Sequence, residues 1–306
     1  MVTVHKHKKI VWIDLDSPTS EEVKDLMKKY PIHPLVANEL VYPTLRGRVD
    51  AYENIIYLIL HFPVFERNRK IFSESEVDFI IGKNFLITAH YRDFNTLHEI
   101  ARMFETNTLS TKDEKLTNVG LLFFQVIKEM YALSINELAE IQAKILAVEE
   151  EIFSRSNNKH DLVRKISHVR RDVLDFRRII HPHREILNVL KNHGEKNLGK
   201  DFSVYMSFLN SDYLRLLHTL ETDKDTVESL QATNDSLVTF HTNSITKNFT
   251  MMAFMTFPLM VIIGLFSIPA KSTPIIGTTG DFWIILVIVI GVLYGLYSIF
   301  RKRGWL

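Results

Sequence analysis

The chain has 306 residues, a net charge of +1, a hydrophobic fraction of 46% and no cysteine. The lack of cysteine excludes disulfides, thiolate metal sites and cysteine nucleophiles. No phosphate-binding glycine loop and no nucleophile elbow occur in the sequence, so no catalytic residue is predicted, and we expect neither an enzyme nor a nucleic-acid partner.

Residues 1–115 are predicted to form an α/β domain. Four apolar runs predict strands, at 10–13, 53–62, 77–81 and 85–88. Gly82-Lys83-Asn84 predicts a hairpin turn between the last two. Between the first two strands we expect a helix that is capped by Ser20 and ends before Pro31. A sheet with helices packed on it is the simplest architecture for this order of elements.

The N-terminal segment is basic and rich in histidine, and no apolar stretch long enough for a signal peptide follows it. We therefore expect the α/β domain to stay in the cytoplasm, with His5 and His7 in a mobile tail. A metal site at His181 and His183 is not favoured, because residues two apart on a helix lie on different faces.

Residues 116–200 are predicted to form an antiparallel helical hairpin. Apolar residues recur at alternating steps of three and four from Ile127 to Ile152 and again from Leu162 to Leu190. This is the seam spacing of a coiled coil. The polar segment Asn157-Asn158-Lys159 separates the two predicted helices.

Residues 201–247 are predicted to form a cytoplasmic stalk helix. No proline or glycine occurs between Asp201 and Pro258, so this helix is expected to continue into the membrane without a break. Residues 201–250 hold seven acidic and three basic side chains, an imbalance that attracts cations.

Two uncharged apolar segments, 248–270 and 282–300, are each long enough to cross a bilayer as a helix. The remaining C-terminal residues form an outer loop and a basic tail, 271–281 and 301–306. Positive residues stay on the cytoplasmic side, and Lys247 and Arg301 flank the two spans. We therefore expect a multi-pass protein of the cell (inner) membrane, with the lipid bilayer as a partner and both termini cytoplasmic.

One face of the first span is a candidate wall for an ion path. It is polar at both ends and bulky and apolar in the middle, and it comprises Asn243, Thr246, Thr250, Ala253, Phe257, Met260, Gly264 and Ser267. Polar and small residues on a membrane helix face protein or water. A ring of Phe257 and Met260 would form a constriction that gates by dewetting. Simple helix packing predicts the same spacing and stays open as an alternative.

Several segments together resemble the CorA superfamily of divalent metal-ion transporters, and the likeness covers nearly the whole chain. The order and spacing of these segments carry the resemblance: His33-Pro34-Leu35, 45–52, 86–90, 221–225, Asn243, Lys247, Thr250, Pro258-Leu259, Gly264, Phe266 and 301–306.

This resemblance implies an α+β membrane protein that forms a funnel-shaped homopentamer. Each copy would contribute an N-terminal α/β cytoplasmic domain, a long helical stalk and two C-terminal transmembrane helices. The implied pore-lining residues are Thr246, Phe249, Thr250, Ala253, Phe257, Met260 and Gly264. The family also senses internal metal through acidic residues, and Asp212 is the nearest acid to that position.

The predicted outer mouth departs from the family. The family's Gly-Met-Asn signature corresponds here to Ser267, Ile268 and Pro269, so the asparagine oxygens that hold a hydrated hard cation are missing. A ring of Lys271 side chains would also repel a dication.

We therefore expect a passive divalent-cation channel for magnesium, cobalt or zinc with altered selectivity, and no cofactor other than a transported or regulatory divalent ion. The alternative is a non-conducting, membrane-anchored oligomeric sensor or scaffold of the same architecture.

Overall fold

The computed structural model describes residues 1–66, 71–92, 95–106, 118–154, 159–199, 201–268, 275–277 and 280–303. These residues form two compact units, Met1–Gln231 and Ala232–Leu306. The division between the units falls inside one helix, α7 (Asp201–Phe266). The predicted boundaries after residues 115 and 270 lie outside the described residues.

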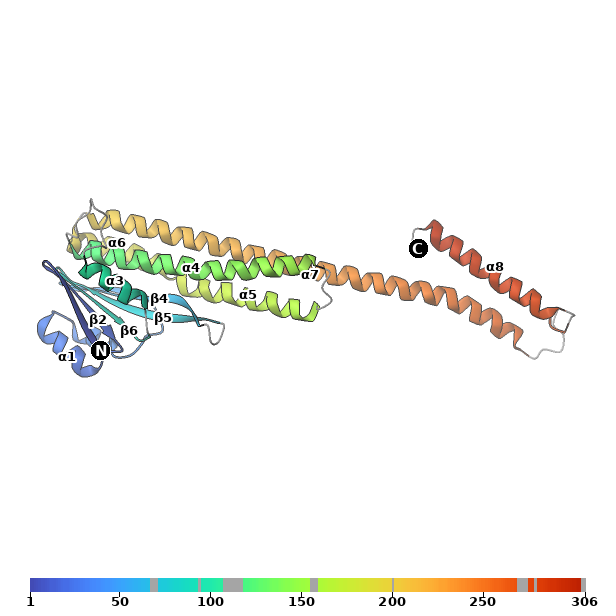
Figure 1. Cartoon of the computed structure of the whole chain (residues 1–306), viewed down its shortest axis with the longest axis horizontal. Coiled ribbons are helices and arrows are strands. Elements are labelled where there is room, and N and C mark those ends of the chain that lie inside the picture. Colours follow the sequence, from blue (N-terminus) through green and yellow to red (C-terminus); the bar gives the residue numbers. More distant parts are fainter. Residues whose placement is uncertain are drawn as a thin grey trace. The chain divides into compact units, whose positions relative to one another are not determined.

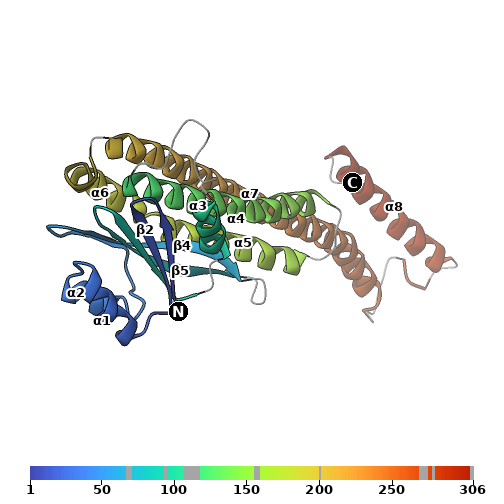
Figure 2. The ribbon, with the colours of Figure 1, turned by 60° about the vertical axis from the view of Figure 1, so that its left-hand side comes forward.

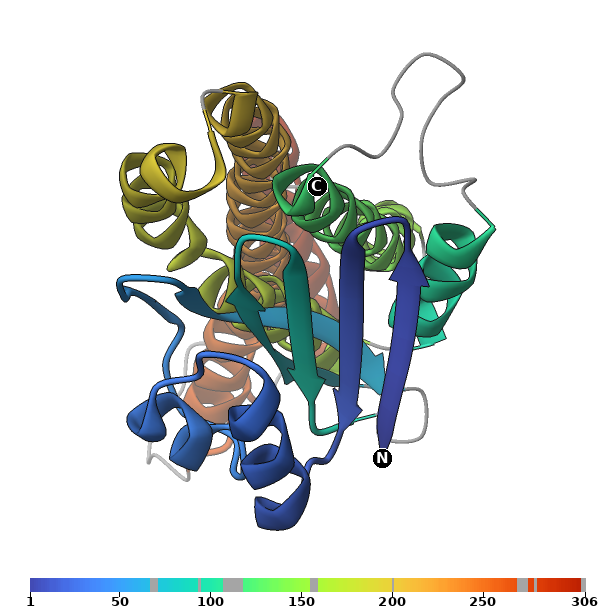
Figure 3. The ribbon, with the colours of Figure 1, turned by 90° about the vertical axis from the view of Figure 1, so that its left-hand side faces the viewer.

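The N-terminal unit is built on a mixed sheet with the strand order β1-β2-β6-β5-β4-β3 (Figure 3). Neighbouring strands are antiparallel, except that β2 and β6 are parallel. The strands are β1 (Val2–His7), β2 (Ile10–Asp16), β3 (Arg48–Ala51), β4 (Ile56–Glu66), β5 (Ile71–Ile81) and β6 (Phe85–His90).

Helices cover both faces of the sheet. Alternate residues of a strand point to opposite faces, so each face of the sheet contributes apolar side chains to its own core. Leu58 and Leu60 of β4 belong to the core that includes α3 (Asn95–Glu105) and α4 (Val119–Phe153). Tyr57 and Ile59 belong to the core under the two short helices. These short helices are α1 (Ser20–Lys29) and α2 (Pro34–Glu39). The predicted architecture of a sheet with helices packed on it is confirmed.

The predicted hairpin and first helix are both present. Gly82 donates a main-chain hydrogen bond to Phe85 at the turn between β5 and β6. Helix α1 begins at Ser20, but its cap is Thr19, whose side chain accepts from the Glu22 amide. The Glu22 carboxylate in turn accepts from the Thr19 amide, which completes a capping box. The expectation that Ser20 caps this helix is wrong.

The N-terminal segment is a strand and not a mobile tail. β1 pairs antiparallel with β2, and His5 lies opposite Trp12. The Nδ1 atom of His5 lies 2.7 Å from Oε1 of Glu105, and the ring of His7 contacts that of Phe104. An edge strand keeps one face in water, so its alternating lysine and histidine residues fit a half-exposed position.

The rest of the N-terminal unit is helical. In Figures 1 and 2, α4, α5 (Lys159–Ile180) and the first part of α7 run side by side. Apolar residues at the predicted seam spacing are buried: Ile141, Ile145, Val148, Leu162, Ile166, Val169 and Val173. A turn at His181 and Pro182 ends α5, and a separate helix, α6 (His183–Leu198), follows. The predicted single helix through Leu190 is therefore interrupted, as expected where proline removes a backbone donor.

The start of α7 is held by one aromatic side chain. Phe202 is buried, and its ring lies so close to Gly120 and Gly194 that a Cβ at either glycine would come within 3 Å of it. Gly199, just before this point, has a φ of 96°, a conformation that a side chain disfavours. The two glycines let α4 and α6 approach Phe202 from two sides.

The C-terminal unit contains the end of α7 and α8 (Asp281–Lys302). Both helices are long and apolar enough to cross a bilayer. Helix α7 continues through Pro258 to Phe266. The predicted continuity of the third helix from Asp201 is thus confirmed.

Candidate ion path and polar sites of the N-terminal unit

The predicted pore-lining residues lie on the last turns of α7. Phe249, Phe257 and Met260 are 67%, 65% and 67% exposed. Residues outside the stripe, such as Phe254 and Leu265, are exposed as well. The polar residues at the ends of the stripe, rather than exposure, therefore distinguish it from the other faces of the helix.

Two hydroxyl groups of the stripe, those of Thr250 and Ser267, are hydrogen-bonded within the helix. Thr250 Oγ1 donates to the main-chain oxygen of Thr246 over 2.8 Å, and Ser267 Oγ donates to that of Ile263 over 2.9 Å. Because each hydroxyl proton is used internally, the remaining lone pairs of the oxygen can only accept. These oxygens suit water or a cation as a partner, not an anion.

The predicted outer mouth is described in part. Helix α7 ends at Phe266, and the Ser267 amide still bonds to the Ile263 oxygen over 3.0 Å. Ser267 and Ile268 are exposed at this end. Pro269 and Lys271 lie outside the described residues.

Asp212 lies half-buried on α7. No group of three histidine, aspartate or glutamate side chains suited to a metal ion occurs among the described residues. Asp212 therefore has no metal-ligand cluster around it within the described part of one chain.

A histidine flanked by two glutamates lies on the sheet of the N-terminal unit. His61 Nε2 is 3.2 Å from Glu76 Oε2 and 3.7 Å from Glu74 Oε1. It is also 3.2 Å from the main-chain oxygen of Thr44, whose amide donates to Glu76 over 2.6 Å. Burial lowers the pKa of His61, but the hydrogen bond to Glu76 and the charge of Glu74 outweigh it, so the pKa is raised.

A second carboxyl group lies beside Glu76. Asp78 is fully buried, and its Oδ2 accepts hydrogen bonds from Tyr57 over 3.0 Å and from Tyr91 over 3.3 Å. Burial and the neighbouring Glu76 raise the pKa of Asp78 well above its usual value. Asp78 Oδ1 has no hydrogen-bond partner among the described atoms.

A polar chain crosses the opposite face of the sheet between β2 and β6. Trp12 Nε1 donates to Thr88 Oγ1 over 3.0 Å, and Thr88 donates to Asp14. His90 Nε2 lies 3.4 Å from Asp14 Oδ2, and its Nδ1 lies 2.6 Å from the main-chain oxygen of Arg92. Burial lowers the pKa of His90 and the Asp14 carboxylate raises it, with a net rise. These residues link the parallel strand pair at its carboxyl end.

Comparison with known proteins relates the whole chain to one family. The family described as "CorA-like Mg2+ transporter protein" matches residues 7–302. The chain belongs to the CorA family.

Individual CorA proteins match over nearly their full length. The cobalt/magnesium transport protein CorA of Thermotoga maritima is 22% identical over 96% of this chain and 83% of that protein. The structure of the CorA magnesium transporter from Methanocaldococcus jannaschii has a TM-score of 0.83 at 21% identity, covering 98% of this chain and 93% of that one. The cytoplasmic domain of ZntB from Vibrio parahaemolyticus has a TM-score of 0.56 at 12% identity, covering 75% and 88%.

Membership of the CorA family confirms three expectations. The chain is a membrane protein with an N-terminal α/β domain, a long helix and two C-terminal apolar helices. It belongs to a family of metal-ion transporters. It is therefore not an enzyme.

The pore-lining positions stay predictions. The polar groups around His61, Asp78 and Asp14 were missed by sequence reasoning. Their partners come from strands that are distant in the chain, as with Asp14 and His90. The one available signal in the sequence for these polar groups was the presence of charged residues within otherwise apolar strand segments. A charged side chain is seldom buried without a partner.

Proposed function

We propose that five copies of this CorA-family protein form a channel that carries divalent cations passively across the cell membrane. One α7 helix from each copy would line the path, with α8 outside it. Residues 201–247 would form the cytoplasmic stalk, and the spans 248–270 and 282–300 would lie in the bilayer. Lys247 and Arg301 support the placement of both termini in the cytoplasm.

The chemistry of the α7 stripe is the observation that carries this proposal. Thr250 and Ser267 present oxygens whose protons are already bonded to the helix. A hydrated divalent cation donates hydrogen bonds from its bound water, so such acceptor rings suit it. Between them, Phe257 and Met260 offer only apolar surface, which supports a gate that closes by excluding water.

The outer mouth supports weaker discrimination between ions. Ser267, Ile268 and Pro269 provide one hydroxyl group per chain and no side-chain amide. Hydroxyl and main-chain carbonyl oxygens can accept hydrogen bonds from a hydrated cation without the amide ring of the family signature, so we propose that magnesium, cobalt and zinc all pass. Asp212 is proposed as a contributor to an internal regulatory metal site between copies.

Ion flux into proteoliposomes tests the proposal. The purified full-length protein is reconstituted, and uptake of magnesium, cobalt and zinc is followed with an ion-sensitive dye trapped inside the vesicles. The mass of the detergent-solubilised oligomer is measured in parallel. A pentameric mass with uptake of at least two of these ions is expected. A pentamer that passes none of them would contradict conduction and leave the scaffold alternative, and a monomer would contradict both.

A further inference from the structure

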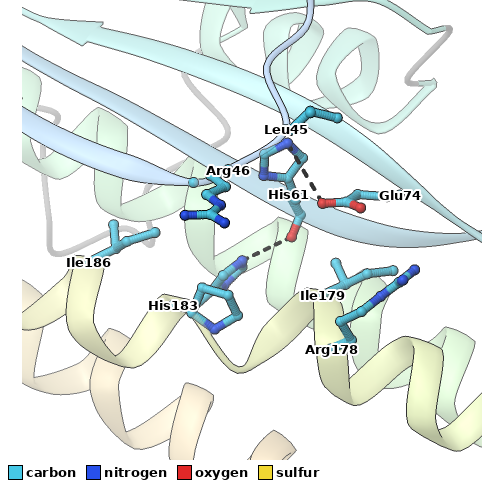
Figure 4. Close-up of a pocket in the computed structure, with 10 residues that line it drawn as sticks. Leu45, Arg46, His61, Glu74, Arg178, Ile179, His183 and Ile186 are labelled. Carbon is cyan, nitrogen blue, oxygen red and sulfur yellow. Dashed lines mark hydrogen bonds and ion pairs between the residues drawn. The ribbon is translucent and has the colours of Figure 1, made fainter.

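A cavity of about 380 Å³ lies in the N-terminal unit where the corner between α5 and α6 meets the sheet (Figure 4). Its polar lining consists of Arg46, Arg178, His61, His183 and Glu74, and Ile179 and Ile186 supply part of its apolar lining. Figure 4 shows Arg46 reaching in from the sheet side and Arg178 rising from α5. The cavity is within the size range of small-molecule sites, roughly 300–1,000 Å³.

The charge in this cavity is positive and incompletely balanced. Arg46 has no ion pair within the described ranges of the chain, and Arg178 has one loose pair, 3.7 Å from Asp175. His61 adds a group whose pKa is raised by its carboxylate neighbours. Glu74 is the single carboxylate among the described lining residues. Among the described residues, two arginines and two histidines therefore line this cavity with a single carboxylate, and the side chain of Arg178 is 72% exposed.

The walls of the cavity are held by close contacts. A Cβ at Gly47 would lie 2.9 Å from both Ile186 Cδ1 and the Ile59 oxygen, so the loop that carries Arg46 is pressed against α6 and β4. On the other side, His183 Nε2 donates to the main-chain oxygen of His61 over 2.9 Å (Figure 4). Both contacts fix the backbone around the arginines before any ligand arrives, which reduces the entropy lost on binding.

A second cavity, of about 270 Å³, extends the site along the sheet. It shares Leu45, His61 and Glu74 with the first and adds Arg92. Leu45 is almost fully exposed between the two spaces. Arg92 is already paired with Glu66 over 2.7 Å, so the exposed leucine and Arg46 are the groups that offer an apolar and a charged contact to the same ligand.

We propose that this pocket binds a small molecule that carries a phosphate group on an apolar ring system, as a nucleoside monophosphate does. The planar guanidinium groups of Arg46 and Arg178 match the oxygens of a phosphate in geometry and charge. The ring lies against Leu45 and Ile179. Glu74 accepts a hydrogen bond from a hydroxyl or amino group of the ligand. This site is separate from the proposed ion path, and the proposal does not depend on conduction.

Calorimetric titration of the full-length protein in detergent tests this site. The probes are AMP, adenosine and inorganic phosphate. AMP is expected to bind saturably, more tightly than inorganic phosphate, and adenosine is expected not to bind. The affinity for AMP should fall as salt is raised, because the arginines are partly exposed. Absence of saturable AMP binding, or AMP binding no tighter than that of phosphate, would overturn the proposal.

Single substitutions locate the site. Arg46→Gln and Arg178→Gln are each expected to weaken AMP binding at least tenfold, since each removes a charged hydrogen-bond donor. Arg171→Gln is the matched control, because Arg171 is an exposed arginine seven residues earlier in α5. AMP affinity that is equal in all three variants would refute the assignment.

Two further measurements separate binding from folding and assembly. Arg46→Lys keeps the positive charge but lacks the planar, two-pronged guanidinium group, so this variant should bind AMP with intermediate affinity. An unchanged thermal midpoint shows that each variant folds. The oligomer mass is recorded for each variant. If Arg46→Gln dissociates the oligomer and no probe binds to the wild type, the arginines hold a second copy, and the ligand proposal is wrong.

Discussion

His183 donates a hydrogen bond from Nε2 to the main-chain oxygen of His61, 2.9 Å away. Its other ring nitrogen, Nδ1, lies 2.9 Å from the hydroxyl group of Tyr131 on α4. Because Nε2 carries the proton, Nδ1 accepts from Tyr131, and the imidazole is neutral with both nitrogens bonded. One buried side chain thereby joins α4, the start of α6 and strand β4.

Removing the tyrosine hydroxyl should destabilise the fold. In Tyr131→Phe the Nδ1 atom of buried His183 loses its donor, and an unpaired buried polar atom costs about 1–3 kcal/mol. We expect a lower thermal midpoint for the full-length protein, followed by intrinsic fluorescence. Tyr42→Phe is the control, because Tyr42 is largely exposed. Equal midpoints for the two variants would show that the hydrogen bond contributes nothing.

The same histidine should make stability depend on acid pH. Burial lowers the pKa of His183 to about 4, from an ordinary value of 6.5. Between these values the unfolded chain binds the proton and the folded chain does not, so stability is complete above pH 6.5 and falls as the pH drops toward 4. The loss is on the order of 3 kcal/mol. His183→Gln should flatten this part of the curve of thermal midpoint against pH, and an unchanged slope would contradict the assignment.

His61 should act in the opposite direction. Its pKa is raised in the folded chain, so its contribution is present below pH 6.5 and is lost as the pH rises through the folded value. In His61→Gln we expect a smaller fall of the midpoint between neutral and alkaline pH than in the wild type. A steeper fall in the variant would show that Glu74 and Glu76 do not favour the charged imidazole.

Substitutions on the α7 stripe should change ion flux without changing assembly. Thr250→Asp adds a ring of negative charge that attracts cations, and Met260→Ala widens the apolar constriction, so both should raise flux several-fold in proteoliposomes. Met255→Ala is the matched control, because Met255 lies about 140° around the helix from Met260. Unchanged flux in both stripe variants, with a normal oligomer mass, would mean that the stripe only packs helices together.

The contact of Phe202 with two glycines should be sensitive to one added methyl group. The Cβ of Gly194→Ala would lie 2.1 Å from Phe202 Cε1, and overpacking of this kind costs about 1–3 kcal/mol. The double variant with Phe202→Leu should recover part of the lost stability. Gly291→Ala, which has no neighbour within 4 Å among the described atoms, is the control. A Gly194→Ala midpoint equal to that of the control would contradict the tight contact.

Strong local patterns account for the elements that were predicted correctly. The β5–β6 hairpin is marked by Gly82 between two apolar runs, and α7 by an absence of proline and glycine after Asp201. Strand β1 was missed because its outward residues are lysine and histidine, which resemble a disordered tail in isolation. The sequence prediction put the N-cap of α1 at Ser20, one residue after the observed cap at Thr19, because threonine and serine are both common capping residues.

The polar sites depend on pairing between distant segments. His61 and Glu76 face each other only because β4 and β5 align in that register. A shift of one residue would place them on opposite faces of the sheet. The arginine-lined cavity likewise joins a loop before β3 to the last turn of α5. No local pattern in the sequence encodes either arrangement.

Within the C-terminal unit, the unbroken helix fixes the angular positions of the stripe residues relative to one another. A helix turns by about 100° per residue, and α7 has no break as far as Phe266. One residue inserted between Thr250 and Phe257 would therefore rotate Phe257 and Met260 by about 100° relative to Thr250, while each of them kept its own neighbours in sequence. The stripe would then be divided between two faces of the helix.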